Sequence, residues 1–206
     1  MTIIAFISQK GGVGKSTLSR AVATEAQKQK IKVFLADCDP QQQTSYEWTQ
    51  WRKEKGLPII PSQVFRSVKE VWPLTKKYVL IIIDAPARAS QATKEIAEKA
   101  DLVIQPIGAS RDDLIPAVKE FNALKKAGIN SQKLLFVLIR LSTNKEAENI
   151  KDYLADTGYN YSSAYLYEKA SYKQAQNEGK AISEVNYKTL RRQAKELIQD
   201  LLKHLE

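Results

Sequence analysis

Short apolar segments alternate along the chain with longer segments whose apolar residues recur at helical spacing. The short segments are residues 2–7, 33–36, 78–83, 102–104 and 134–139. They are continuous apolar runs rather than alternating patterns, which is typical of strands buried on both faces of a parallel sheet. Helical spacing follows at residues 15–30, 41–55, 90–99, 111–126, 145–156 and 184–204.

This order of elements predicts an α/β fold: a doubly wound, mostly parallel sheet with helices on both faces. The 206 residues contain no repeat, low-complexity tract or long linker, so we expect a single domain over residues 1–206. Folds of this class bind their ligands at the carboxyl ends of the strands. The residues that directly follow the strands are therefore the first functional candidates.

The charge of the chain narrows the choice of partners only in part. Lys and Arg exceed Asp and Glu by 32 − 23 = 9 residues. This balance favours a polyanion such as nucleic acid or an anionic membrane surface, but a solvated basic surface without a partner explains it equally well. We find no signal peptide and no apolar stretch of membrane-spanning length, and the single cysteine, Cys38, cannot form an internal disulfide. These features predict a cytoplasmic protein.

The segment after the first strand has the pattern of a phosphate-binding loop. It reads Lys10, Gly11, Gly12, Val13, Gly14, Lys15, Ser16 and Thr17. The glycines let backbone N–H groups turn toward an anion, and the N-terminus of the next helix adds free donors and a positive dipole end. Lys15 is placed to reach the β- and γ-phosphates of a nucleotide, and the Ser16 hydroxyl to bind Mg²⁺.

The sequence of this loop departs from the ordinary phosphate-loop consensus and partly matches a second motif, so the two motifs have to be compared. Gln9 stands where the ordinary phosphate-loop consensus has a glycine. The dinucleotide-binding fingerprint is the competitor, because Gly12 and Gly14 have its first spacing and Asp37 follows at a plausible distance. Thr17 occupies the place of its third glycine, however, and that motif has no role for the Lys-Ser pair. We therefore favour a triphosphate.

The loop resembles the deviant Walker A motif of the ParA/MinD family of P-loop ATPases, and the resemblance covers most of residues 2–140. In that family the early lysine, here Lys10, reaches across a dimer to the phosphates of the ATP bound by the partner subunit. The resemblance therefore implies that Lys10 and Lys15 serve two different nucleotides.

Carboxylates follow two other strands. Asp37-Cys38-Asp39-Pro40-Gln41 resembles the switch I segment of the family, which makes Asp39 the catalytic aspartate that positions the attacking water. The apolar run that ends in Asp84 resembles a Walker B strand followed by switch II, with Asp84 holding Mg²⁺ through water. Asp37 is a further candidate for supporting Mg²⁺. Aspartates so close to a triphosphate would repel it without a metal, so the cofactors expected are ATP and Mg²⁺.

Two weaker assignments come from the same resemblance. Asp113 corresponds to an aspartate near the nucleotide and the dimer interface, although Gln105 and Arg111 are unusual for that segment. Arg140 stands where the family often packs the base. We carry both residues forward as nucleotide-site candidates.

The chain is most similar to the small plasmid-partition ParA type (ParF-like), because the loop begins at Lys10 and leaves no room for an N-terminal helix-turn-helix domain. Such proteins dimerise on Mg-ATP, bind non-specific DNA, and hydrolyse ATP slowly until a centromere-binding adaptor (ParB/ParG-like) stimulates them. The resemblance thus implies a homodimer that associates with the nucleoid in the cytoplasm.

The last predicted helix separates two functional classes. Its apolar stripe, Leu190–Leu205, is most simply a face packed on the sheet. The opposite face is basic and would give salt-sensitive binding to DNA; its residues are Lys188, Arg191, Arg192 and Lys195. The alternative is a MinD-like membrane-associated positioning ATPase whose helix lies on lipid, but acidic residues interrupt the basic face, so we favour DNA. A metabolic ATP-dependent enzyme is a third class, which Lys10 argues against. A single cysteine excludes iron–sulfur chemistry.

Overall fold

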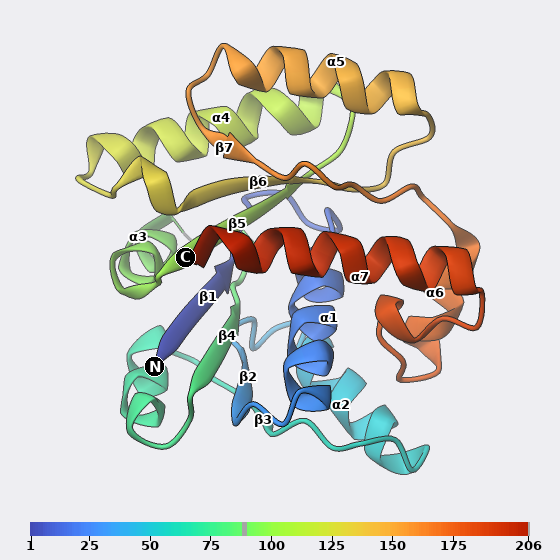
Figure 1. The fold of residues 1–206 in the computed structure, drawn as a ribbon. Coiled ribbons are helices and arrows are strands. Elements are labelled where there is room, and N and C mark those ends of the chain that lie inside the picture. The colour runs from blue at the N-terminus through green and yellow to red at the C-terminus, as the bar shows by residue number, and fades with distance from the viewer. Residues whose placement is uncertain (88–89, 206) are drawn as a thin grey trace.

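A parallel sheet of seven strands forms the centre of the molecule (Figure 1). The computed structural model describes residues 1–87 and 90–205. The sheet order is β3-β2-β4-β1-β5-β6-β7, and every described pairing is parallel. The strands are β1 (Thr2–Phe6), β2 (Val33–Asp37), β3 (Ser62–Val64), β4 (Leu80–Asp84), β5 (Leu102–Ile107), β6 (Leu134–Leu138) and β7 (Asn160–Tyr161). The predicted α/β class and doubly wound sheet are confirmed.

Helices cover both faces of this sheet, as Figure 1 shows. The α-helices are α1 (Lys15–Lys28), α2 (Thr44–Glu54), α3 (Ser90–Lys99), α4 (Arg111–Lys126), α5 (Asn144–Ala155), α6 (Ala170–Asn177) and α7 (Lys188–Leu202). Short 3₁₀ segments are η1 (Val68–Lys76), η2 (Ser131–Lys133), η3 (Ile182–Glu184) and η4 (Lys203–Leu205). Helices α1 and α7 pack into the apolar layer on one face, and α3, α4 and α5 into the layer on the other.

The strand register places the candidate site. Phe6 at the end of β1 pairs with Asp84 of β4, and Asp37 of β2 pairs with Asp84 from the other side. The carboxyl ends of the three adjacent strands β2, β4 and β1 therefore meet at one edge of the sheet. The loop after β1 and the two aspartates are brought together there, as a parallel sheet requires.

Two helices begin later than the sequence pattern predicts. We expected a helix from Gln41, but Asp39 Oδ1 accepts the N–H groups of Gln41 and Gln42, and this turn delays α2 to Thr44. The last helix was expected from residue 184 but begins at Lys188, after the 3₁₀ turn η3. The apolar stripe of α7 packs as expected, with Ala194, Leu197, Ile198 and Leu201 buried.

Candidate nucleotide-binding site

The loop between β1 and α1 has the conformation of an anion cradle. Gly12 and Gly14 have φ angles of 73° and 107°, which favour glycine. A Cβ added to Gly14 would lie 2.3 Å from Ile139 Cδ1, so Ile139 would have to shift to admit a side chain at this position. No side chain caps the start of α1, which leaves its first backbone donors for a ligand. Lys15 begins the helix and is only 8% exposed.

Ser16 and Asp84 form the part of the site that suits a divalent cation. Asp84 is buried, and burial raises the pKa of its carboxyl although the nearby hydroxyls of Ser45 and Ser16 act to lower it. Its Oδ2 accepts from Ser45 Oγ at 2.6 Å, whereas Oδ1 has no hydrogen-bond partner among the described residues. Ser16 Oγ lies 3.1 Å from Thr44 Oγ1. An unpartnered carboxylate oxygen beside a hydroxyl is a donor set that Mg²⁺ prefers.

Asp37 has a structural role that accounts for its burial without a metal. Its Oδ2 accepts the backbone N–H groups of Ser45 and Tyr46 at 2.9 and 3.0 Å, and its Oδ1 accepts that of Asp39 at 3.0 Å. These bonds satisfy orphan donors at the start of α2. Burial, and then the neighbouring charge of Asp84, raise the pKa of Asp37 to about 6. Its support of Mg²⁺ stays a prediction.

The structure brings most of the predicted phosphate-site residues around one cavity of about 210 Å³. This cavity is lined by Gly11, Gly12, Gly14, Lys15, Ser16, Thr17, Asp39 and Asp84, among others. Asp39 comes from the turn before α2 and Asp84 from the end of β4, so three loops converge here. Val13, by contrast, is buried and lies outside this lining.

Lys10 lies outside this cavity. Its side chain is 50% exposed, and its ammonium contacts the carboxylate of Asp113. Asp113 belongs to the first turn of α4, and Gly108 leaves room for it, because a Cβ there would lie 2.5 Å from Asp113 Oδ2. Lys10 and Asp113 are therefore neighbours, and neither reaches the phosphate cavity of its own chain.

A second cavity of about 240 Å³ lies on the other side of the glycines. Arg140 lines it and donates from Nη1 to the carbonyl of Gly12 at 2.8 Å. The remaining lining includes Ile139, Leu166, Tyr167, Tyr172 and Gln176. Because this cavity adjoins the phosphate loop and is largely apolar, it suits a nucleotide base. The sequence pattern indicated Arg140 but not residues 166–176, which only the fold brings to the loop.

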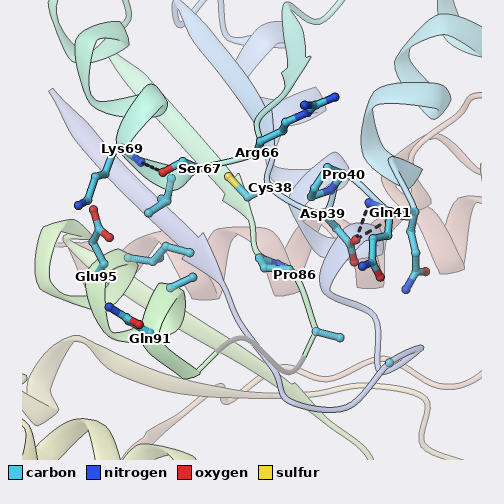
Figure 2. A pocket seen from close by; sticks show the side chains of 16 residues that line it. Cys38, Asp39, Pro40, Gln41, Arg66, Ser67, Lys69, Pro86, Gln91 and Glu95 are labelled. Carbon is cyan, nitrogen blue, oxygen red and sulfur yellow. Dashed lines mark hydrogen bonds between the residues drawn. The ribbon is translucent and has the colours of Figure 1, made fainter.

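A wider groove of about 810 Å³ opens beside the turn before α2 that carries Asp39 (Figure 2). Figure 2 shows Asp39, Pro40 and Gln41 on one side, and Gln91 and Glu95 of α3 on the other. Cys38 lines the groove and is buried, and burial raises the pKa of its thiol. A thiol in this state is a poor nucleophile, so Cys38 is structural here.

Sequence patterns missed a buried polar chain behind the aspartates. Arg20 of α1 donates from Nε to Ser45 Oγ at 3.3 Å, and from Nη1 to Gln176 Oε1 at 3.3 Å. Ser45 in turn donates to Asp84. These contacts connect the candidate metal site to α6 beside the second cavity. No local motif marks them, because the residues are up to 156 positions apart in the chain.

The predicted DNA-binding residues lie on α7, away from its buried face. Lys188 and Arg192 are exposed, and Arg192 Nε lies 3.4 Å from Glu196. Lys195 and Arg191 are half-buried, and Arg191 donates to the carbonyls of Val185 and Asn186. Arg191 thus has a local structural role, and the DNA contacts of all four stay a prediction. Among the described residues, no helix has the length and apolar content needed to cross a bilayer.

Comparison with known proteins shows which proteins this chain is similar to. The model of the CobQ/CobB/MinD/ParA nucleotide binding domain family matches residues 4–182. The protein ParA of Rhizobium radiobacter is 26% identical over 115 residues, which are 52% of this chain and 49% of that protein. The chain spans about half or less of the length of the curated relatives it matches.

Solved structures agree on the fold. The Borrelia burgdorferi B31 protein BB_S35, bound to AMPPNP, superposes with a TM-score of 0.74 at 19% identity, covering 98% of both chains. A chain of the MinC:MinD cell division protein complex of Aquifex aeolicus gives a TM-score of 0.76 at 16% identity, covering 98% of this chain and 96% of that chain. Because the family model matches most of the chain, this protein belongs to the CobQ/CobB/MinD/ParA nucleotide-binding domain family.

Proposed function

We propose that the chain is a Mg²⁺-dependent ATPase of the plasmid-partition type, which dimerises on ATP, binds non-specific DNA and hydrolyses ATP slowly. One observation carries the proposal: the loop presents two lysines in different settings. Lys15 is buried in the cradle, whereas Lys10 is half exposed and outside the phosphate cavity. A lysine so placed is available to a second subunit. Family membership and the curated ParA relative support the activity and the biological process.

Each group in the site has a role in this proposal. The N–H groups of the loop and Lys15 bind the phosphates, and Ser16 and Asp84 hold Mg²⁺, which neutralises charge on the transferred phosphoryl group. Asp39 orients the attacking water. Lys10 of one subunit approaches the phosphates bound by the other, and Arg140 borders the base. Positioning and charge neutralisation are sufficient for phosphoryl transfer.

The basic residues of α7 form the proposed DNA surface. The apolar face of this helix is buried against α1 and the sheet, so it is not free to enter lipid while the helix stays packed. This packing disfavours the alternative of a MinD-like membrane-associated ATPase. The proposal also includes a centromere-binding adaptor (ParB/ParG-like) as the partner that stimulates hydrolysis, and a nucleoid-associated location in the cytoplasm.

Retention on immobilised duplex DNA tests the proposal. The wild-type chain is expected to be retained with Mg-ATP, less with Mg-ADP, and progressively less as salt is added, because DNA binding releases counterions. Lys15→Ala should abolish ATP binding and the retention with it. Equal retention with and without ATP, or none at low salt, would refute the DNA part of the proposal, and binding to anionic vesicles instead would support the alternative.

A pair of double variants tests whether the basic residues of α7 form the DNA surface. Replacing the exposed Lys188 and Arg192 by Ala should weaken retention without changing ATP-dependent dimerisation. Replacing Lys119 and Lys126 by Ala removes the same charge from exposed positions of α4, on the other face of the sheet, and should change retention less. Equal effects of the two double variants would remove α7 as the DNA surface.

A further inference from the structure

A buried polar pair lies beneath the start of the phosphate loop. Gln105 of β5 is 2% exposed and Glu120 of α4 is 4% exposed. Gln105 Nε2 donates to Glu120 Oε2 at 2.7 Å, and the backbone N–H of Gln9 donates to the same oxygen at 3.3 Å. The pair therefore fixes the residue that precedes Lys10, and joins the loop to both β5 and α4.

The surroundings of this pair are apolar. The same face of α4 buries Leu114, Ala117, Phe121 and Leu124. An ionised carboxylate in such a layer loses its hydration, and no described residue forms an ion pair with Glu120. A residue that contradicts the local apolar pattern so clearly is a candidate for a functional role.

Two oxygens of the pair lack donors. Glu120 Oε1 and Gln105 Oε1 are both buried and have no hydrogen-bond partner among the described residues. Both are acceptors when Glu120 is ionised, so neither can satisfy the other. A proton on Glu120 Oε1 supplies the missing donor, and a carboxylic acid and a primary amide then form two antiparallel hydrogen bonds. The neutral form of Glu120 therefore explains both unpartnered atoms.

The burial of Glu120 also favours its neutral, protonated form. Burial raises the pKa of Glu120 to about 7, against the opposing effects of Gln9, Gln105 and Lys15. The positive charge of Lys15 is one of the effects that lower the pKa of Glu120. Lys15 is also the group that the bound phosphates would neutralise. The carboxylate form of Glu120 and the bound phosphates thus share the positive field of Lys15, so phosphate binding favours the protonated carboxyl.

We propose that Glu120 is a protonated positioning residue, paired with Gln105 as acid and amide, and that nucleotide binding at Lys15 tightens its hold on the proton. The phosphates remove the positive field that favours the carboxylate and add negative charge nearby. Binding therefore takes up a proton wherever the free chain has begun to lose it. This inference rests on the proposed nucleotide binding and adds a proton to that equilibrium.

Calorimetric titration with ADP at pH 8, in HEPES and in Tris, tests the inference, because the difference in buffer ionisation enthalpy reports protons exchanged on binding. The wild-type chain is expected to take up a fraction of a proton. Glu120→Gln keeps the shape and the hydrogen bonds of the side chain but cannot titrate. Its proton uptake on ADP binding should therefore be smaller than that of the wild type by this fraction. Its ADP affinity should also depend less on pH between 7 and 9 than that of the wild type, which weakens by up to about a further tenfold for a pKa change of one unit.

Two further variants make the result decisive. Asp112→Asn removes an exposed carboxylate from the same helix and should behave as wild type. The double variant Gln105→Leu with Glu120→Leu replaces the pair by side chains that the apolar layer accepts, and serves if Glu120→Gln misfolds. It too should lose the proton uptake that Glu120 contributes.

Asp37 and Asp84 titrate in all these proteins, so their contributions to proton uptake cancel in the comparison. Equal proton uptake by wild type and variants that bind ADP would overturn the inference alone, whereas no ADP binding by wild type would overturn the proposed function as well.

Discussion

The ammonium of Lys10 contacts the carboxylate of Asp113 within one chain. The contact joins the phosphate loop to the first turn of α4, across 103 positions of sequence. Lys10 is half exposed, so the pair is worth no more than about 1 kcal/mol. In the single chain, Asp113 therefore holds Lys10 weakly, in a position from which a second subunit could take it.

Asp113→Asn should release Lys10 from this intramolecular partner. Because the lost pair is weak, the free energy of unfolding should change by less than about 1 kcal/mol. Because a dimer contains two such pairs, ATP-dependent dimers should form at a protein concentration up to about 30-fold lower, as measured by analytical ultracentrifugation. Asp112→Asn is the matched control, since Asp112 is exposed on the same turn. Weaker dimerisation of the Asp113 variant would show instead that Asp113 acts in the interface.

Asp39→Ala should slow hydrolysis and leave ATP binding intact. Asp39 lines the phosphate cavity, but its carboxylate also accepts two N–H groups of its own turn. Asp39→Asn keeps an acceptor for that turn and serves as the control for local structure. Phosphate release should fall at least about tenfold in both variants, and the ATP-bound dimer should accumulate. Turnover at the wild-type rate would remove Asp39 from the reaction.

Glu120 should make the stability of the free chain depend on pH. Its pKa is raised from 4.5 to about 7 in the folded chain, so the folded state binds the proton more tightly than the unfolded state. The stabilisation is complete below about pH 4.5 and is lost as the pH rises through 7, with a total of about 3 kcal/mol. Urea denaturation at several pH values should show a larger loss in the wild type than in Glu120→Gln, because the contributions of Asp37 and Asp84 are common to both. Parallel curves for the two proteins would contradict the buried proton.

Arg52→Ala should destabilise the chain without removing a nucleotide contact. Arg52 is fully buried and donates to Glu184 at 2.5 and 3.2 Å and to the carbonyl of Gly179 at 2.9 Å. Removing it leaves Glu184 with the partly exposed Lys28, 3.4 Å away, as its cationic partner, at a cost of up to about 3–5 kcal/mol. Lys53→Ala, at the exposed neighbouring position, should cost little. A small decrease in the free energy of unfolding of the Arg52 variant, measured by urea denaturation, would show that water hydrates Glu184 in place of Arg52.

The central strands and the phosphate loop could be predicted because their signals are local. Strands such as β4 and β6 are buried on both faces and therefore read as continuous apolar runs. The edge strands β3 and β7 have three and two residues, too few for a periodic signal. Helix α6 also escaped prediction, because its eight residues bury only two side chains and are otherwise polar.

The residues of the candidate site also fall into those that the sequence predicted and those that only the fold brings together. Lys10, Lys15, Ser16 and Asp84 follow strands in recognisable patterns, whereas Arg20, Ser45 and the lining of the second cavity become neighbours only through the sheet crossovers. Gln105 offered one usable signal, since it interrupts an otherwise apolar strand. Its partner Glu120 occupies the apolar face of α4, and only the fold shows that the two polar residues meet.

The claim that Lys10 serves a second subunit is tested most directly by the mass of the ATP-bound species. Size-exclusion chromatography with light scattering would compare Asp39→Ala with the double variant Lys10→Ala and Asp39→Ala, both loaded with Mg-ATP. The account predicts a dimer for the single variant and an ATP-bound monomer for the double variant. A double variant that binds ATP and still elutes as a dimer would contradict it.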